Sequence, residues 1–199
     1  MNSKTSPPLL ELLSDIRACT ECKDNLPCGP RPILAAHQDA PILIIGQAPG
    51  RRVHDSGVAW DDPSGERLRD WLGVERADFY DESKIALVPM GYCYPGTGKS
   101  GDLPPRRECA ELWHERLLAE LTGVKLTLLV GMYAQKYRLG SQRKSNLTET
   151  VKAWKEFKPK CLPLPHPSPR NNIWMKKNPW FASEVLLYLR GRVKRVLRG

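Results

Sequence analysis

The amino-acid sequence predicts a three-layer α/β/α sandwich built around a short parallel sheet of about four strands. Four apolar runs are nearly continuous, as in strands that are buried on both faces of a parallel sheet. Amphipathic helical patterns lie between these runs, which is the alternation expected of an α/β fold. A chain of 199 residues is long enough for one domain with a sizeable core, so we expect a single domain over residues 1–199.

The first half of the chain supplies two strands and the helices that follow them. The runs "ILIIG" (42–46) and "IALVPM" (85–90) predict the first two strands. Between them, residues 64–72 predict a helix with Ser64, a favoured capping residue, at its start. After the second strand, residues 106–121 predict another helix. Its apolar positions include Leu112, Leu117, Leu118 and Leu121.

The second half repeats the alternation. The runs "LTLLVG" (126–131) and "CLPLP" (161–165) predict the third and fourth strands. A helix is expected over residues 131–139, directly after the third strand, and a last helix over about 181–197. The last helix has one apolar stripe, made of Val185, Leu189, Val193 and Val196.

The chain is basic and lacks the features of a membrane or secreted protein. Its 31 Lys and Arg residues exceed 22 Asp and Glu residues, giving a net charge of +9. A polyanionic partner is therefore expected, although charge alone does not separate nucleic acid from anionic lipid. No run of about 18 apolar residues occurs, and the N-terminal segment has no apolar signal core. We expect a cytoplasmic protein.

The six cysteines are more consistent with metal or cluster ligation than with disulfide bonds, because the cytoplasm is reducing. Cys19 and Cys22 form a C-x2-C pair, and Cys93 and Cys109 have fifteen residues between them. Cys28 is a nearby candidate without an assigned role. Cys161 heads the fourth predicted strand, so we expect it in the core.

Ligands of open parallel sheets bind beyond the carboxyl ends of the strands, so the loops after the strands are the candidate site. These loops begin with "GQAPG", "GYCYPG", "GMYA" and "HPSPRN". In the last, Pro165, Pro167 and Pro169 stiffen the backbone around His166, because proline restricts its own φ and the residue before it. Such a loop holds polar side chains in fixed directions.

The second loop contains an incomplete phosphate-binding pattern. Gly96, Gly98, Lys99 and Ser100 match the end of G-x-x-x-x-G-K-[ST], but Cys93 stands where the first glycine is required. The next residues, "GDLPPRR", cannot begin the helix that would hold phosphate at its N-terminus. We therefore expect a flexible, positively charged loop.

The segments "GQAPG" and "HPSPRN", at the ends of the first and fourth strands, resemble motifs one and two of the uracil-DNA glycosylase superfamily. The resemblance spans nearly the whole chain and is closest to the iron–sulfur branch first known from thermophiles, which has a C-x2-C pair and a second cysteine pair around a proline-rich loop. It implies a structural four-iron four-sulfur cluster. Zinc, or no metal with ordinary buried thiols, stays open as an alternative. The implied ligands are Cys19, Cys22, Cys93 and Cys109.

The resemblance also implies a pocket for a base that has left the DNA stack. The pocket floor would be formed by Gly46, Gln47 and Ala48, and Trp60 would stack on the base unless it is a core residue. His166 would donate a hydrogen bond to uracil O2 as negative charge develops there. The prolines would hold this donor in place before the reaction begins.

Two positions depart from the best-known members of the superfamily. Ala48 stands where they carry an aspartate that positions the attacking water. Asp62, or its neighbour Asp61, would take over this role, unless Asp62 only caps the helix near Ser64. The asparagine that reads the uracil edge is also absent, since Pro89 occupies its place, and backbone groups of Met90 and Gly91 or the side chain of Asn171 would replace it.

Basic and polar residues near the same loops would contact DNA. By resemblance, Ser168 and Pro169 would hold phosphate and Arg170 would fill the gap left by the flipped base. The cations expected to contact the DNA backbone include Arg51, Arg52, Lys99, Arg106, Arg107 and Lys176, although each is compatible with an ordinary surface position.

Three functions are consistent with these residues. The first is a monomeric, monofunctional glycosylase that removes uracil from single- or double-stranded DNA. The second is a glycosylase for another deaminated base such as hypoxanthine, which the missing asparagine favours. The third is a protein that captures uracil-containing DNA without turnover, either non-covalently or, as in one branch of the superfamily, covalently through His166.

Overall fold

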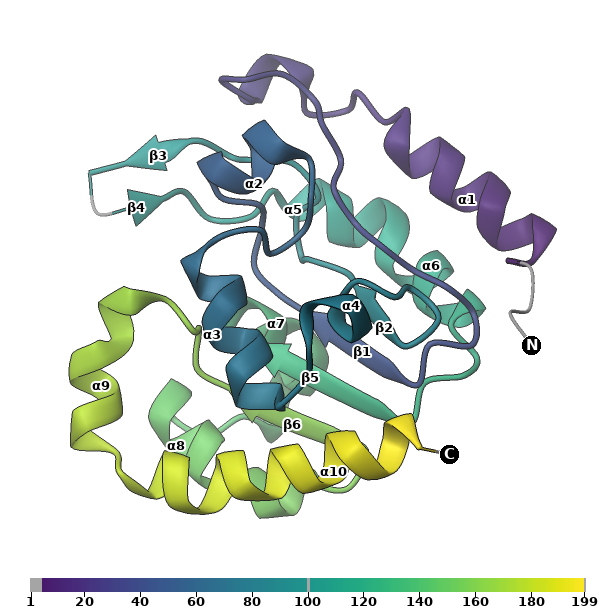
Figure 1. Cartoon of the computed structure of the whole chain (residues 1–199). Coiled ribbons are helices and arrows are strands. Elements are labelled where there is room, and N and C mark those ends of the chain that lie inside the picture. The colour runs from purple at the N-terminus through teal and green to yellow at the C-terminus, as the bar shows by residue number, and fades with distance from the viewer. Residues whose placement is uncertain (1–4, 100, 199) are drawn as a thin grey trace.

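The computed structural model describes residues 5–99 and 101–198 and contains one central parallel sheet (Figure 1). The strand order is β2 (Ile85–Leu87), β1 (Ile42–Ile45), β5 (Leu126–Val130) and β6 (Cys161–Leu164). Ile42 is in register with Ile85 on one side and with Leu126 on the other. The four predicted strands are therefore confirmed, each ending within three residues of its expected end.

Side chains on alternate positions of the strands enter two separate cores, one on each face of the sheet. Ile42 and Ile44 pack in the first core, whereas Leu43 and Ile45 pack in the second. The first core is covered by α3 (Pro63–Leu72), α4 (Arg76–Phe79), α8 (Leu147–Lys152) and α10 (Leu187–Leu197). The second is covered by α1 (Pro7–Arg17), α6 (Glu115–Glu120) and α7 (Met132–Leu139). This arrangement confirms the three-layer sandwich.

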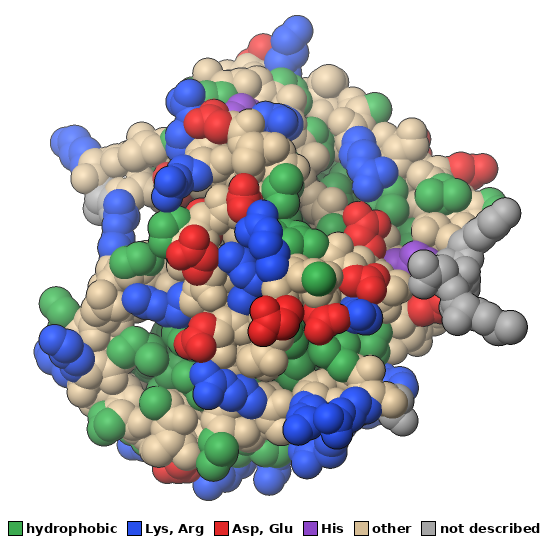
Figure 2. All heavy atoms as spheres, in the orientation of Figure 1, with side chains coloured by type: hydrophobic (Ala, Val, Ile, Leu, Met, Phe, Trp, Pro, Cys, Tyr) green, Lys and Arg blue, Asp and Glu red, His purple; other side chains and the backbone are tan. Residues whose placement is uncertain are grey.

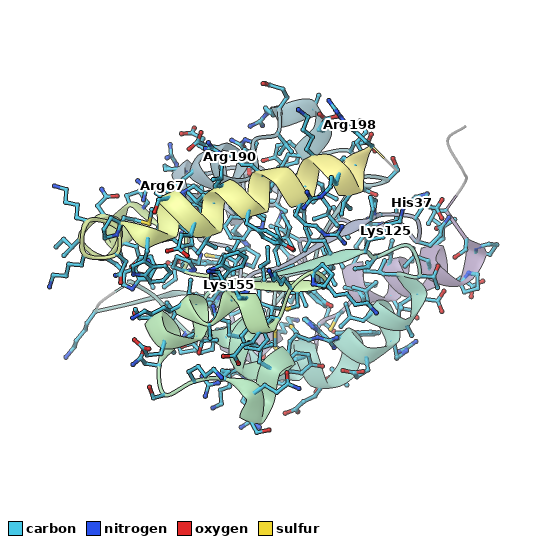
Figure 3. The ribbon with its side chains drawn as sticks, turned by 90° about the horizontal axis from the view of Figure 1, so that it is seen from below. His37, Arg67, Lys125, Lys155, Arg190 and Arg198 are labelled. Carbon is cyan, nitrogen blue, oxygen red and sulfur yellow. The ribbon has the colours of Figure 1, made fainter. Side chains whose placement is uncertain are left out.

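The C-terminal helix lies across the molecule, with the cations Arg190 and Arg198 along it (Figure 3). The segment before it, Phe181–Leu186, is π-helical. The first turns of the helix expected over 181–197 are therefore wider than α-helical turns. The predicted stripe of Val185, Leu189, Val193 and Val196 is buried. Arg190 donates from Nη2 to the backbone oxygen of Asp70 in α3 at 3.0 Å, so this cation fixes α10 to its neighbour.

Two other predicted helices differ from expectation. The segment expected as one helix over 106–121 consists of α5 (Arg107–Cys109), a π-helical segment (Ala110–His114) and α6. Helix α3 begins with Pro63 rather than after Ser64, and its N-cap is Asp62. Asp62 takes this position because its carboxylate accepts a hydrogen bond from a backbone N–H of the first turn, which stabilises the helix start.

Several short elements had no clear signal in the sequence. They include α2 (Arg51–Ser56), α9 (Asn172–Lys177) and the hairpin of β3 (Thr97–Gly98) and β4 (Gly101–Asp102). Short 3₁₀ turns occur at Lys23–Asn25, Gly140–Gln142, Trp154–Glu156 and Pro169–Asn171. The hairpin occupies the loop that we expected to be flexible; Lys99 lies at its turn, and Ser100 lies outside the described residues. No helix in the described part of the chain is long and apolar enough to cross a membrane.

Candidate active site

A pocket of about 410 Å³ opens at the carboxyl ends of the parallel strands, where the loops after β1, β2 and β6 meet. This is the edge at which open α/β sheets bind their ligands. The side chains and backbone groups that line it come from four separate segments. They belong to Ile33, Gly46, Gln47, Ala48, Pro49, Gly50, Val53, Ala59, Trp60, Asp62, Ser64, Pro89, Gly101, Asp102, Leu103, His166, Ser168, Arg170 and Asn171.

His166 lines this pocket, and its ring is hydrogen-bonded within its own loop. The backbone N–H of Ser168 donates to Nδ1 at 3.2 Å, which assigns the proton of the neutral ring to Nε2. Burial lowers the pKa of His166 to about 4, so the ring is neutral at neutral pH. The side chain of Asn171 also donates to the backbone oxygen of His166 at 2.7 Å. The loop therefore fixes both the tautomer and the direction of the ring.

Trp60 stands beside His166 in an unusual backbone conformation. Its φ angle is 58°, in the left-handed region that non-glycine residues rarely adopt, and its ring stacks with that of His166 at 5.7 Å. Two glycines make room for it. A Cβ atom on Gly46 would lie 2.8 Å from the indole, and one on Gly65 would lie 1.7 Å from the backbone oxygen of Trp60. Trp60 thus lines the pocket and also packs against the first core.

Of the two candidate carboxylates, the structure brings only Asp62 into the pocket. Asp62 caps α3 by accepting from the backbone N–H of Gly65 at 2.7 Å, and it lines the pocket as well. Burial raises the pKa of the Asp62 carboxyl above its ordinary value. Asp61 instead pairs with Arg76 at 3.0 Å and is not among the lining residues. The capping role expected as the alternative is therefore present and compatible with a place in the pocket.

The backbone of the motif-one loop is fixed by hydrogen bonds from the loop after β2. Gly46 and Gln47 accept from the N–H groups of Met90 and Gly91 at 3.1 and 3.0 Å. The Met90 N–H is therefore engaged, and its side chain is buried in the second core. Pro89 lines the pocket in its place. Of the three residues expected to substitute for the missing asparagine, Met90, Gly91 and Asn171, only Asn171 is a lining residue.

The residues expected to contact DNA occupy different environments. Ser168 and Arg170 line the pocket, and the Ser168 hydroxyl accepts from the backbone N–H of Arg170 at 3.2 Å. Pro169 begins the 3₁₀ turn and is exposed. Arg51 and Arg52 lie exposed on α2, where Arg51 pairs with Asp55 at 3.0 Å. Lys176 is exposed on α9.

Basic side chains are spread over a wide surface. Figure 2 shows Lys and Arg side chains around α2 and the β3–β4 hairpin and along α10, with acidic groups between them. Two cations besides Arg51 that were expected to contact DNA have acidic partners. Arg107 pairs with Glu111 at 3.4 Å, and Arg106 pairs with Glu108.

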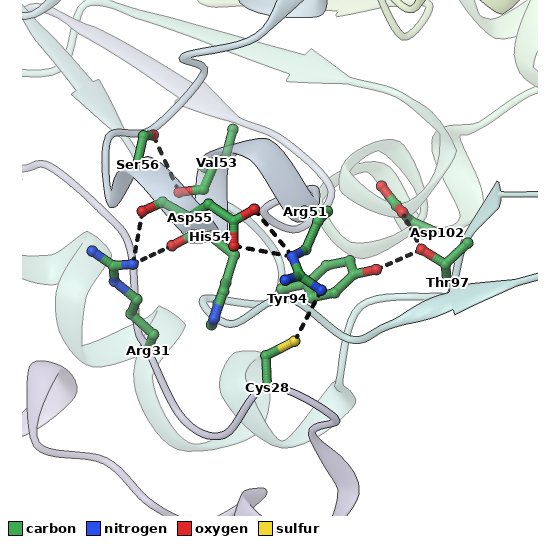
Figure 4. A network of polar contacts seen from close by, with 10 residues as sticks. All are labelled: Cys28, Arg31, Arg51, Val53, His54, Asp55, Ser56, Tyr94, Thr97 and Asp102. Carbon is green, nitrogen blue, oxygen red and sulfur yellow. Dashed lines mark hydrogen bonds and ion pairs between the residues drawn. The ribbon is translucent and has the colours of Figure 1, made fainter.

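The β3–β4 hairpin and the residue after it supply pocket residues that were not predicted from the sequence. Gly101, Asp102 and Leu103 line the pocket, and Thr97 donates to the Asp102 carboxylate at 3.3 Å (Figure 4). Thr97 is itself hydrogen-bonded to the buried Tyr94 hydroxyl. Strands of two residues have no detectable periodicity, so the only signal was the position of "GDLPP" after a strand end.

A second, smaller cavity is lined by all four cysteines expected to form a cluster site. Cys19, Cys22, Cys93 and Cys109 come from three segments of the chain and meet there. Burial raises the pKa of the free thiols, to about 11 for Cys93 and about 12 for Cys109. Within residues 5–99 and 101–198, no three His, Cys, Asp or Glu side chains form a group that could hold a metal ion.

The remaining cysteines lie elsewhere. Cys28 contacts Arg51 (Sγ to Nη1, 3.6 Å) and is not a lining residue of the cysteine cavity (Figure 4). Cys161 packs against the second core, as expected.

The four cysteine thiols that line this cavity are suitable ligands for an iron–sulfur cluster. A four-iron cluster takes each thiolate on a different iron atom, so its ligands need not converge as tightly as those of one ion. Backbone hydrogen bonds from Arg31 and Tyr92 to the sulfurs of Cys93 and Cys109 favour their thiolate forms and lower the pKa of each against the effect of burial. The side chain of Arg106 has the same effect on Cys22.

Comparison with known proteins gives a match over most of the chain. A sequence model of the uracil DNA glycosylase superfamily matches residues 34–190. Among solved structures, the chain is similar to a Methanosarcina acetivorans protein studied by solution NMR and provisionally described as a uracil DNA glycosylase. The identity is 14% and the TM-score 0.43, with 80% of this chain and 97% of that chain covered.

Proposed function

The chain belongs to the uracil DNA glycosylase superfamily, and on that premise we propose that it removes uracil from DNA by hydrolysing the N-glycosidic bond. The observation that most strongly supports this is the neutral His166 ring, whose Nε2–H is a fixed donor in the 410 Å³ pocket. A departing uracil takes the electron pair of the broken bond and becomes an anion. A hydrogen bond from a neutral, preorganised donor stabilises that anion and is worth about 3–4 kcal/mol in comparable sites.

The base must leave the helix before it can enter the pocket. In the proposed complex the base stacks on Trp60, whose ring occupies space that a side chain at position 46 would block. Arg170, exposed on the loop after β6, enters the space that the base leaves in the duplex. Gln47 and Asn171 supply polar atoms at the pocket wall.

Asp62 is the proposed partner of the attacking water. The hydrogen bond from Gly65 fixes the carboxylate at the pocket wall, where it can orient water toward the sugar carbon. Its negative charge also favours the positive charge that develops on the sugar, as in glycoside hydrolysis. The water oxygen bonds to that carbon, its proton passes to the carboxylate, and the products are free base and an abasic site.

A second candidate function is the removal of another deaminated base such as hypoxanthine. It is favoured by the absence of the usual asparagine and by Pro89, a residue without a side-chain donor, at the pocket wall. Covalent capture through His166 has less support, because the assigned tautomer carries a proton on the nitrogen that would attack. The two alternatives predict different products: an abasic site in place of hypoxanthine in one case, and a covalent protein–DNA complex in the other.

We also propose that the four-cysteine cavity holds a structural four-iron four-sulfur cluster. The lining thiols and the hydrogen bonds directed at their sulfurs support it. When bound, the cluster would tie the N-terminal segment to the loop after β2 and take no part in bond cleavage. Zinc is the alternative, and the measured ratio of iron, sulfide and zinc to protein decides between them.

One assay distinguishes the candidate functions. End-labelled single- and double-stranded oligonucleotides containing uracil, hypoxanthine or, as the control, thymine are incubated with the protein and then treated with alkali. Cleavage at uracil alone supports the first function, and cleavage at hypoxanthine alone supports the second. A protein–DNA band that survives a denaturing gel without cleavage supports covalent capture. Unchanged DNA contradicts both glycosylase functions and covalent capture, and a native gel then shows whether the protein binds uracil-containing DNA non-covalently.

A further inference from the structure

The cysteine cavity is surrounded by buried polar groups that lack a partner. In the described part of the chain, six buried side-chain nitrogen or oxygen atoms have no hydrogen bond. Three of the six belong to residues lining this one small cavity: Tyr92 Oη, Arg106 Nε and Trp113 Nε1. Buried polar groups in native proteins are nearly always paired, so three such atoms around one cavity indicate a missing acceptor.

Two of these atoms define the chemistry of that acceptor. The indole Nε1–H of Trp113 and the Nε–H of Arg106 can only donate, whereas the hydroxyl of Tyr92 can also accept. The acceptor must therefore be electron-rich and must lie close to the thiols of the cavity. The inorganic sulfides and thiolate sulfurs of a cluster are acceptors of this kind.

The backbone around Cys109 positions both donors. Arg106 is the N-cap residue of α5, three residues before Cys109, and its guanidinium is hydrogen-bonded to Glu108 and contacts Cys22. Trp113 lies in the π-helical segment Ala110–His114, directly after Cys109. A π-helical turn is wider than an α-helical one and changes which side chains share a face. Residues four apart lie on the same face of a helix, and Trp113 and Cys109 accordingly both line the cavity.

We propose that Trp113 and Arg106 are hydrogen-bond donors to the sulfur atoms of the cluster and thereby determine its reduction potential and its resistance to loss. The inference rests on the proposed cluster and is independent of the proposed reaction on DNA. Hydrogen bonds to cluster sulfur stabilise the more negative, reduced state. Removing one donor therefore lowers the midpoint potential and exposes the cluster to faster loss in air.

The test compares two donor variants with two matched controls in the full chain, reconstituted without oxygen. Trp113→Phe removes the indole N–H, and Arg106→Met removes the guanidinium at similar length. The control Trp180→Phe removes an indole N–H that donates to Asn178 at 3.2 Å, away from the cavity. The control Arg107→Met removes the adjacent cation, which pairs with Glu111.

The readouts are iron and sulfide content, midpoint potential, rate of bleaching in air, and the resonance Raman Fe–S frequencies in H₂O and D₂O. The donor variants are expected to have lower potentials and faster bleaching, while the controls match the wild type. The backbone N–H groups of Arg31 and Tyr92 also exchange in D₂O, so the D₂O shift is compared between proteins: it should be smaller in the two donor variants than in the wild type and the controls. The two donor variants are independent, so either one that folds tests the inference. Equal potentials and equal D₂O shifts in the folded variants and the controls would overturn it. A wild type without iron and sulfide would reject the cluster itself, whatever its activity on DNA.

Discussion

Asp62 accepts a hydrogen bond from the backbone N–H of Gly65 at 2.7 Å, so one carboxylate caps α3 and also faces the pocket. These two tasks can be separated, because asparagine caps helices about as well as aspartate but has no charge. Asp62→Asn should therefore keep the free energy of unfolding nearly unchanged while lowering the single-turnover rate about 10²–10³-fold. Rapid-quench kinetics with excess enzyme over uracil-containing DNA measures the rate.

Asp61→Asn is the matched control for this experiment. It removes the neighbouring carboxylate, which pairs with Arg76 outside the pocket, and should leave the rate unchanged. If Asp62→Asn is folded and cleaves at the wild-type rate, Asp62 is only a helix cap and another group must orient the water.

The depressed pKa of His166 predicts a pH dependence of stability. Unfolded histidine binds a proton near pH 6.5, whereas burial lowers the pKa of folded His166 to about 4. Between these values the unfolded chain binds more protons, so the contribution of His166 to stability is complete above about pH 6.5 and is lost as the pH falls toward 4. Urea denaturation from pH 7 to pH 4.5 should show wild type losing stability relative to His166→Asn. Parallel curves for the two proteins would show that His166 is not kept neutral by the fold.

The contact between Gly46 and Trp60 predicts that a single methyl group damages the pocket. Gly46→Ala would place its Cβ 2.8 Å from the indole, so the ring must move away from its stacking position. Base–aromatic stacking is worth about 1–3 kcal/mol, so capture of the flipped base should weaken about ten-fold or more. Fluorescence of a base analogue opposite or beside uracil reports the flipped state. Gly191→Ala, whose added Cβ meets open space on α10, should bind like the wild type.

The exposed cations near the pocket predict a strong salt dependence of DNA binding. Each Lys or Arg that neutralises a phosphate releases condensed counterions, so the logarithm of the affinity should fall linearly with the logarithm of the salt concentration. Lys176→Ala should weaken binding for all sequences and reduce this slope by about one. Arg190→Ala should leave the slope unchanged, since Arg190 is bound to α3. Affinity that does not depend on salt would contradict the proposed DNA contacts.

The sequence was most informative where burial determines the pattern. The four strands are continuous in apolar residues because both faces of the sheet are covered, and the stripe of α10 follows from its single contact face. The sequence was least informative for residues whose type is compatible with more than one role. The resemblance favoured Asp62 over its neighbour Asp61 but left both open, and the structure brings only Asp62, the N-cap of α3, into the pocket wall. Arg106 was expected at the DNA surface but lines the cysteine cavity, where its guanidinium contacts Glu108 and Cys22.

The loop between Cys93 and Cys109 contributes lining residues to both cavities. Its ends lie at the cysteine cavity, and its middle, at Gly101, Asp102 and Leu103, forms part of the base pocket wall. The proposed cluster would hold the ends of this loop together, and a loop closed in this way samples far fewer conformations than one that is free at its base. Loss of the proposed cluster would therefore loosen the wall of a pocket that none of its four thiols touches, and we expect poorer discrimination between bases to precede unfolding.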